Sequence, residues 1–174
     1  MGKNTWKTLP DASRGLKDRI NIVVSSTMKA DELNADNTTK SETYLVKSFD
    51  ESMELCKTLN PGKIFIGGGN NIYKEALEKL NIDEIYMTHI GKNYNCDNIF
   101  PINTLNSVIF PINTLNGIDA IDQYKEGCNK TFIVKDLNTN EDVSVNFRKL
   151  YKGEIPKNVN TEEQQYLDLL EDIL

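Results

Sequence analysis

The chain has 174 residues, of which 39% are hydrophobic and 26% are charged. This balance is typical of one globular domain with a sizeable core and argues against a disordered or fibrous protein. The formal charge of -6 argues against a protein that binds the nucleic-acid backbone, because such proteins carry a basic face.

The first predicted elements are two strands followed by a helix. Residues 20–25 (INIVVS) form an apolar, β-branched run that predicts a buried strand, and residues 44–47 (YLVK) predict another. Within SFDESMELCKTL, Ser48 and Glu51 have the spacing of a capping box, which predicts a helix. One face of that helix carries the residues expected to pack inward: Ser52, Leu55, Cys56 and Leu59.

The alternation continues along the chain. Residues 63–68 (KIFIGG) predict a strand that ends in glycines, residues 70–80 (NNIYKEALEKL) a helix, and residues 83–90 (DEIYMTHI) a strand. Residues 131–147 (TFIVKDLNTNEDVSVNF) predict two strands around an Asn-rich turn. Strands that alternate with helices and end in a hairpin indicate the α/β class with a mixed sheet.

Neither the cysteines nor the chain's apolar runs indicate a secreted, membrane or metal protein. Cys56, Cys96 and Cys128 are far apart, form no CxxC pair, and have only His89 as an imidazole partner. This pattern argues against a disulfide framework and structural zinc, and His89 is interpreted as structural. The polar start MGKNTWKTLP and the lack of a long apolar window predict a cytoplasmic protein without a membrane or metal partner.

A triplet of glycines, Gly67, Gly68 and Gly69, lies between a predicted strand and a predicted helix. Glycines let a ligand approach the backbone, and the free amides at a helix start favour phosphate. The triplet lacks the lysine of a P-loop and the G-x-G-x-x-G spacing. It therefore has two readings from the residues alone, a phosphate-binding turn and an ordinary strand-to-helix turn.

Two further segments also have both a functional and a structural reading. Residues 2–5 (GKNT) combine a small residue, a cation and polar donors suited to an anion, and they equally suit a surface helix start ahead of a buried Trp6. Arg19 precedes a predicted strand, where it either binds a carboxylate in bidentate fashion or is a solvated flank.

Six motifs occur in a fixed order: MGKNTW, LP, LKDRINIVVSS, IFIGGGNNIYKEAL, IDEIYMTHI and CDNIFP. Residues 1–152, which contain them, resemble dihydrofolate reductase. After a linker at residues 153–160, residues 161–174 (TEEQQYLDLLEDIL) resemble the first helix of thymidylate synthase in fused reductase-synthase chains. The resemblance implies an α/β fold of three layers with a mixed, mostly parallel sheet. It also implies NADPH-dependent reduction of 7,8-dihydrofolate to 5,6,7,8-tetrahydrofolate, and dimerisation of the fusion through its synthase part.

The resemblance also implies contacts with both ligands. The positions matching cofactor contacts are Gly2, Lys3, Asn4, Thr5, Ser25, Ser26, Gly68, Gly69, Asn70, Asn71, Ile72 and Tyr73, and Gly68 and Gly69 match a glycine pair joined by a cis peptide bond. The positions matching folate contacts are Leu9, Leu16, Arg19, Gly67 and Thr88. Arg19 would bind the glutamate carboxylate, and Thr88 would support the pterin. Gly67 departs from the family, which usually has an aliphatic residue there.

Family members begin with a strand, a mobile loop and a helix whose carboxylate hydrogen-bonds the pterin, and the resemblance starts after them, at Met1. We therefore expect the central strand between residues 63–68 and 83–90 to be absent, and the chain, expressed alone, to fold poorly and reduce dihydrofolate negligibly. A non-catalytic fragment that keeps part of the ligand sites is the alternative.

Residues 99–116 contain the sequence IFPINTLN twice, ten positions apart. Two copies are too few for a stacked repeat architecture. Asp97 precedes the first copy at the distance expected for an acidic residue of the family loop, so residues 109–116 are interpreted as an inserted duplicate that lengthens a surface loop.

Overall fold

The structure, a computed structural model, describes residues 1–11, 14–33, 41–98, 100–101 and 124–155. The chain divides into two compact units, Met1–Lys79 and Leu80–Leu174. The predicted linker and terminal helix lie outside the described residues except for residues 153–155, and so does the second copy of the repeated segment.

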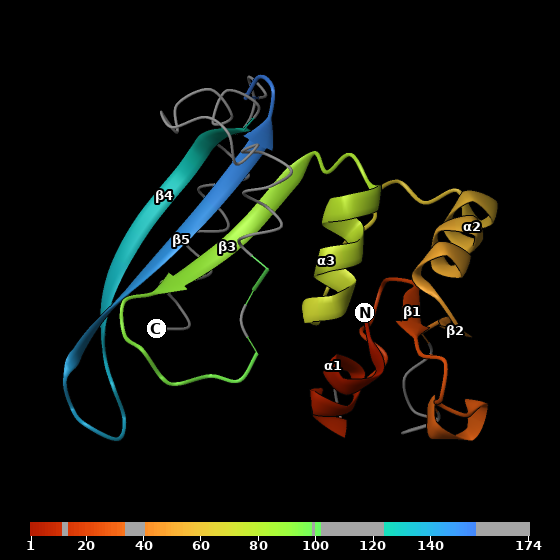
Figure 1. The fold of residues 1–174 in the computed structure, drawn as a ribbon, viewed down its shortest axis with the longest axis horizontal. Helices are drawn as coiled ribbons and strands as arrows, with labels where there is room; N and C mark the ends of the chain where they lie inside the picture. Colours follow the sequence, from red (N-terminus) through yellow and green to blue (C-terminus); the bar gives the residue numbers. More distant parts are fainter. Residues whose placement is uncertain (12–13, 34–40, 99, 102–123, 156–174) are drawn as a thin grey trace. The chain divides into compact units, whose positions relative to one another are not determined.

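The described residues of the first unit form three α-helices, a short 3-10 helix and two parallel strands (Figure 1). Strands β1 (Asn21–Val24) and β2 (Thr43–Val46) pair in parallel, as expected for the two apolar runs. The helices are α1 (Lys3–Thr8), α2 (Phe49–Leu59) and α3 (Asn70–Lys79), with the 3-10 helix η2 (Ala30–Leu33) between the strands. The strands predicted at residues 20–25 and 44–47 and the helices predicted at residues 48–59 and 70–80 are confirmed.

Helix α2 begins and ends through local interactions that its sequence predicts. The Ser48 hydroxyl accepts a hydrogen bond from the Glu51 amide at 3.1 Å. The Glu51 carboxylate accepts from the Lys47 amide at 2.7 Å, one residue before the amide that a standard capping box uses. Asn60, in the left-handed region at φ 46°, ends the helix, and Ser52 and Cys56 are buried as predicted.

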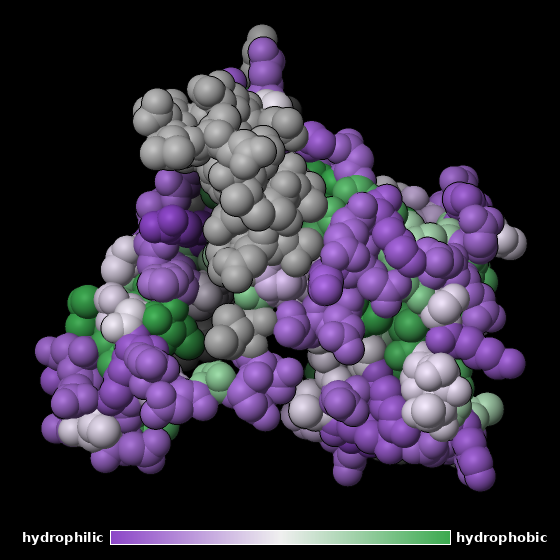
Figure 2. Space-filling model, in the orientation of Figure 1, coloured by the Kyte–Doolittle hydropathy of each residue, from purple (hydrophilic) through white to green (hydrophobic). Residues whose placement is uncertain are grey.

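Trp6, Val23 and Met28 form one hydrophobic core cluster in the first unit. Trp6 and Val23 are almost fully buried, with 1% and 0% of their surfaces exposed. Four partly buried residues pack against this cluster: Met1, Leu9, Leu33 and Leu45. Helix α1 is thereby held against β1, and Figure 2 shows hydrophilic side chains over much of the visible surface of this unit.

The prediction of a strand at residues 63–68 is wrong, because these residues pair with no described strand. Ile64 and Phe65 are 47% and 73% exposed. The described edges of β1 explain the outcome. One edge pairs with β2, and on the other Met1 accepts a hydrogen bond from the Val24 amide at 2.8 Å, next to a bridge between Gly2 and Val24. The run therefore finds no open edge on β1.

The second unit is built on an antiparallel sheet of three strands in the order β3–β5–β4. They are β3 (Glu84–Ile90), β4 (Tyr124–Lys135) and β5 (Asp142–Lys152). The predicted hairpin is confirmed, and its strands extend beyond the apolar residues that predicted them. The α/β class is also confirmed, with parallel pairing of described strands confined to β1 and β2.

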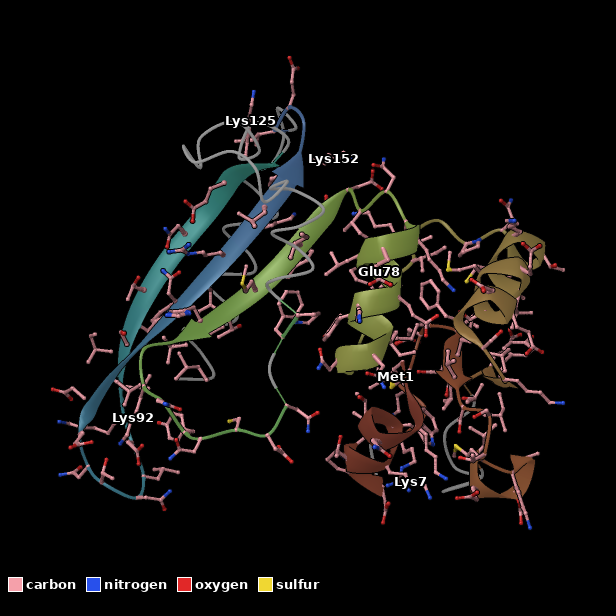
Figure 3. All side chains as sticks on the ribbon, in the orientation of Figure 1. Met1, Lys7, Glu78, Lys92, Lys125 and Lys152 are labelled. Carbon is pink, nitrogen blue, oxygen red and sulfur yellow. The ribbon has the colours of Figure 1, made fainter. Side chains whose placement is uncertain are left out.

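A buried carboxylate joins the loop after β3 to the hairpin turn of the second unit. Asp136 accepts hydrogen bonds from Lys92 Nζ at 2.9 Å and Tyr94 Oη at 2.8 Å, and from the amides of Asn138 and Thr139 at 2.8 and 3.0 Å. These donors hold its pKa below the usual range, with the Lys92 bond the largest cause. Figure 3 shows Lys92 beside this turn.

In the described ranges, no helix is long and apolar enough to cross a membrane. The same ranges contain no group of three or more His, Cys, Asp or Glu residues positioned to hold a metal ion.

Candidate functional site

The site is centred on the place where α1 and α3 both begin. The Gly2 amide donates to the Gly68 carbonyl at 2.7 Å, and the Trp6 amide donates to the Gly2 carbonyl at 3.0 Å. In Figure 3 Met1 lies between the start of α3 and α1. The two segments that had an anion-binding reading in the sequence are therefore in direct contact.

Two glycines lie at this contact, and the structure favours glycine at both positions. Gly68 has φ +81°, a backbone conformation that is energetically unfavourable for residues with a side chain. A Cβ there would also lie 2.7 Å from the ring of Tyr73. A Cβ on Gly69 would lie 3.3 Å from Oγ1 of Thr5. The peptide bond between Gly68 and Gly69 is cis, as the resemblance implies. Gly68 thereby accommodates the ring of Tyr73, and Gly69 lets Thr5 of α1 lie close to the start of α3.

Helix α3 presents free backbone donors at this place. Its first internal hydrogen bond runs from the Tyr73 amide to the Gly69 carbonyl at 2.9 Å, so the amides of residues 70–72 have no acceptor within the helix. Its first turn carries no acidic residue. Asn70 and Asn71 are exposed, whereas the Ile72 side chain is buried and can offer a ligand only its amide. The arrangement favours a phosphate oxygen.

The predicted serines lie at the end of β1. The Ser25 amide donates to the Val46 carbonyl at 2.8 Å, and the Ser25 hydroxyl oxygen accepts from the Met28 amide at 3.0 Å. These bonds hold the turn after β1 and leave the hydroxyl proton of Ser25 for a further acceptor. Ser26 is exposed.

The cations of α1 lie against a carboxylate that the sequence analysis did not select. Lys3 Nζ is 4.0 Å and Lys7 Nζ 2.6 Å from Oε2 of Glu32. The other carboxylate oxygen accepts from the Lys29 amide at 3.0 Å. The Lys7 bond, followed by the Lys29 bond, lowers the pKa of Glu32 to about 2. Asn4, between the two lysines in the chain, is exposed.

The predicted folate contacts of the first unit lie in and beside the loop before β1. Arg19 is exposed, and its Nε donates to the Lys17 carbonyl at 2.9 Å, so its terminal nitrogens are available to a carboxylate. Leu16 is half-buried in the same loop, and Leu9 packs on the Trp6 cluster. Gly67 is exposed, and a Cβ there would lie 3.7 Å from Met1 Cβ.

Asn21 is a second residue that the sequence analysis missed. Its side chain is buried, and Nδ2 donates to the carbonyls of Leu16 at 3.1 Å and Arg19 at 3.3 Å. The side-chain amide of Asn21 thereby holds the loop that carries Arg19 through two hydrogen bonds. An asparagine inside the apolar run INIVV was the available signal, because a buried amide needs hydrogen-bond partners.

Thr88 and Asp97 belong to the second unit and are placed within that unit alone. Thr88 is exposed on β3, opposite Phe147 of β5. Asp97 is exposed and accepts from Nδ2 of Asn98 at 3.2 Å. Their predicted roles toward the pterin and the active-site loop stay predictions.

Comparison with known proteins gives a family match over most of the chain. Residues 1–126 match the family model of dihydrofolate reductase. The bifunctional dihydrofolate reductase-thymidylate synthase of Plasmodium berghei (strain Anka) is 34% identical over 151 residues, which cover 84% of this chain and 25% of that protein. The dihydrofolate reductase of Bos taurus is 35% identical over 105 residues, which cover 58% of this chain and 52% of that protein. The chain therefore spans a quarter of the first relative and about half of the second.

Proposed function

The chain belongs to the dihydrofolate reductase family, and from this premise we propose that it takes part in the NADPH-dependent reduction of dihydrofolate to tetrahydrofolate. The observation that carries the proposal is the contact between Gly2 and Gly68, which brings a lysine-bearing helix start to a glycine turn and the free amides of α3. That combination suits the phosphates of a dinucleotide.

The residues present fit NADPH as the cofactor. Lys3 and Thr5 supply a cation and a hydroxyl from α1, and the amides of residues 70–72 supply donors from α3. Because Gly68 and Gly69 have no Cβ, Tyr73 and Thr5 lie directly against the backbone of this turn. Ser25 and Ser26 add hydroxyls at the end of β1 for the phosphate on the adenosine ribose.

The remaining assignments follow the resemblance. NADPH supplies the hydride when bound, and Arg19 would hold the glutamate carboxylate of dihydrofolate with the nitrogens that its bond to Lys17 leaves unused. Leu9, Leu16 and Gly67 would contact the folate from the first unit, and Thr88 would support the pterin. We propose residues 1–152 as the reductase part, residues 153–160 as a linker and residues 161–174 as the first helix of a synthase part. The cytoplasmic location and dimerisation through the synthase part stay predictions.

Binding of NADPH tests the proposal directly. We expect saturable quenching of the emission of Trp6, the single tryptophan of the chain, or enhancement of NADPH fluorescence. Lys3→Gln should weaken binding, whereas the matched variant Lys57→Gln should not, because Lys57 pairs with Glu54 on the exposed face of α2. An absence of saturable NADPH binding would overturn the proposal.

A parallel assay separates the enzyme from the ligand-binding alternative. Oxidation of NADPH in the presence of dihydrofolate, followed by absorbance, reports turnover by the same preparation. Binding accompanied by turnover supports the reductase, and binding without turnover favours the non-catalytic fragment.

A further inference from the structure

Glu32 occupies a fixed position over the cations of α1. Its two carboxylate oxygens are held from different directions, Oε1 by the Lys29 amide at 3.0 Å and Oε2 by Lys7 Nζ at 2.6 Å. The same Oε2 is 4.0 Å from Lys3 Nζ. Because η2 packs through Leu33 on the Trp6 cluster, the carboxylate is carried by a short helix anchored to the core.

Lys3 is one of the groups expected to meet a ligand phosphate, and it is already partly neutralised. A carboxylate oxygen at 4.0 Å lowers the positive potential that an incoming anion would experience at Lys3 Nζ. The strongly lowered pKa of Glu32 means that this charge is present at every pH at which the protein would be assayed. A phosphate must therefore bind next to a permanent negative charge or displace it.

We propose that Glu32 is an internal counter-ion of Lys3 and Lys7 that competes with the phosphate of the bound dinucleotide and thereby sets the affinity of the site. The inference rests on the proposed function, since it concerns the same anion site. Its role is positioning and electrostatic, with no part in hydride transfer.

The size of the effect follows from the exposure of the pair. The side chains of Lys3, Lys7 and Glu32 are 29%, 48% and 32% exposed, so solvent screens their interaction. Ion pairs between partly exposed side chains contribute little free energy, so removing the carboxylate should tighten anion binding only roughly twofold to fivefold. Because the competition is coulombic, the gain should shrink as the ionic strength rises above about 0.15 M.

The test compares the dissociation constants of NADPH and of inorganic pyrophosphate for the wild-type chain and Glu32→Gln. Gln keeps an oxygen that can accept from the Lys29 amide, and circular dichroism checks that the fold is retained. The matched control is Asp31→Asn, which removes the same charge from an exposed neighbour on η2. We expect a tightening for Glu32→Gln that exceeds that of Asp31→Asn and that disappears when Lys3 and Lys7 are both replaced by Gln.

The outcomes separate this inference from the proposed function. If the wild type binds NADPH and Glu32→Gln binds it no more tightly than Asp31→Asn does, the counter-ion role is overturned and the proposed function stands. An equal tightening in a chain that lacks both lysines, Lys3→Gln with Lys7→Gln, also overturns the counter-ion role, because the charge would then act without either cation. If neither the wild type nor Glu32→Gln binds NADPH or pyrophosphate, both proposals fail.

Discussion

Gly68 and Tyr73 fit together only because Gly68 has no side chain. The ring of Tyr73, one turn into α3, lies 2.7 Å from the place where a Cβ of Gly68 would be. Gly68 also has φ +81°, so an alanine there would meet both a backbone and a packing penalty.

We predict that Gly68→Ala lowers the free energy of unfolding by about 2 to 4 kcal/mol, the sum of strain at positive φ and overpacking. Chemical denaturation followed by circular dichroism measures the change. Two glycines of the same chain separate the contributions. Gly153 also has a positive φ, +77°, but a Cβ there would have no neighbour within 4 Å, so Gly153→Ala should cost about 1 to 2 kcal/mol of stability from backbone strain alone. Gly62 has neither a positive φ nor a close neighbour, so Gly62→Ala shows the effect of the substitution without strain or overpacking. A cost for Gly68→Ala equal to that for Gly62→Ala would contradict the described turn.

The Asp136 network predicts a pH dependence of stability. The pKa of Asp136 in the folded protein lies below its ordinary value of 3.8, chiefly because of the Lys92 bond. Its contribution is therefore fully present above that ordinary value and is lost as the pH falls through it toward the folded pKa. Wild type and Asp136→Asn should differ clearly in Tm at pH 7, and the difference should begin to narrow as the pH falls below about 4.

Thermal melts of both chains between pH 3 and pH 7 measure the start of that narrowing. Asp142→Asn is the matched control, since it removes a carboxylate that is 62% exposed from the same hairpin. A constant difference in Tm between wild type and Asp136→Asn over the whole range would show that the carboxylate acts without its charge.

The side chain of Asn21 should fix the conformation of the loop that carries Arg19. Asn21→Ala removes the donor to two loop carbonyls and should cost about 1 to 3 kcal/mol of stability. Asn21→Asp has the same shape but places a carboxylate against those carbonyls, so it should cost more. Calorimetric titration with dihydrofolate should show weaker binding for both variants. Affinity that is unchanged while stability falls would separate Asn21 from the position of Arg19.

Trp6 is predicted to tolerate a smaller aromatic residue. Its indole Nε1 is buried and has no hydrogen-bond partner in the described part of the chain. Trp6→Ala should cost about 3 to 5 kcal/mol through the cavity that it leaves. In Trp6→Phe the lost volume is offset by removal of an unpaired donor, itself worth about 1 to 3 kcal/mol, so the net cost should be small. Urea unfolding by circular dichroism measures both, and a Phe variant as unstable as the Ala variant would refute the idea.

Features whose causes are local could be predicted from the sequence. Helix α2 is an example, because its cap, its buried face and its end depend on residues within one segment, from Ser48 to Asn60. The turn at Gly68 and Gly69 is another. The predicted strand at residues 63–68 failed because a strand also needs a partner, and that information lies elsewhere in the chain.

The missed site residues have the same explanation. Glu32 contacts Lys7 across 25 positions of sequence, and nothing in ADEL identifies that partner. The cofactor roles of Gly2, Lys3 and Gly68 follow from the resemblance, since each lies in one of its motifs, and they stay predictions. The electrostatic setting of Lys3 emerged only when the folded chain brought η2 to α1.

Residues 63–67 have the composition of a buried strand, but their backbone amides should exchange hydrogen with the solvent rapidly. Ile64, Phe65 and Ile66 have the residue types of a protected central strand, yet their amides donate to no described backbone group and two of the side chains face water. Their deuterium uptake should therefore be complete within seconds, whereas the amides of β5, bonded on both sides, keep their protons far longer. This apolar stretch of the first unit is thus among the first described parts of the chain to equilibrate with the solvent.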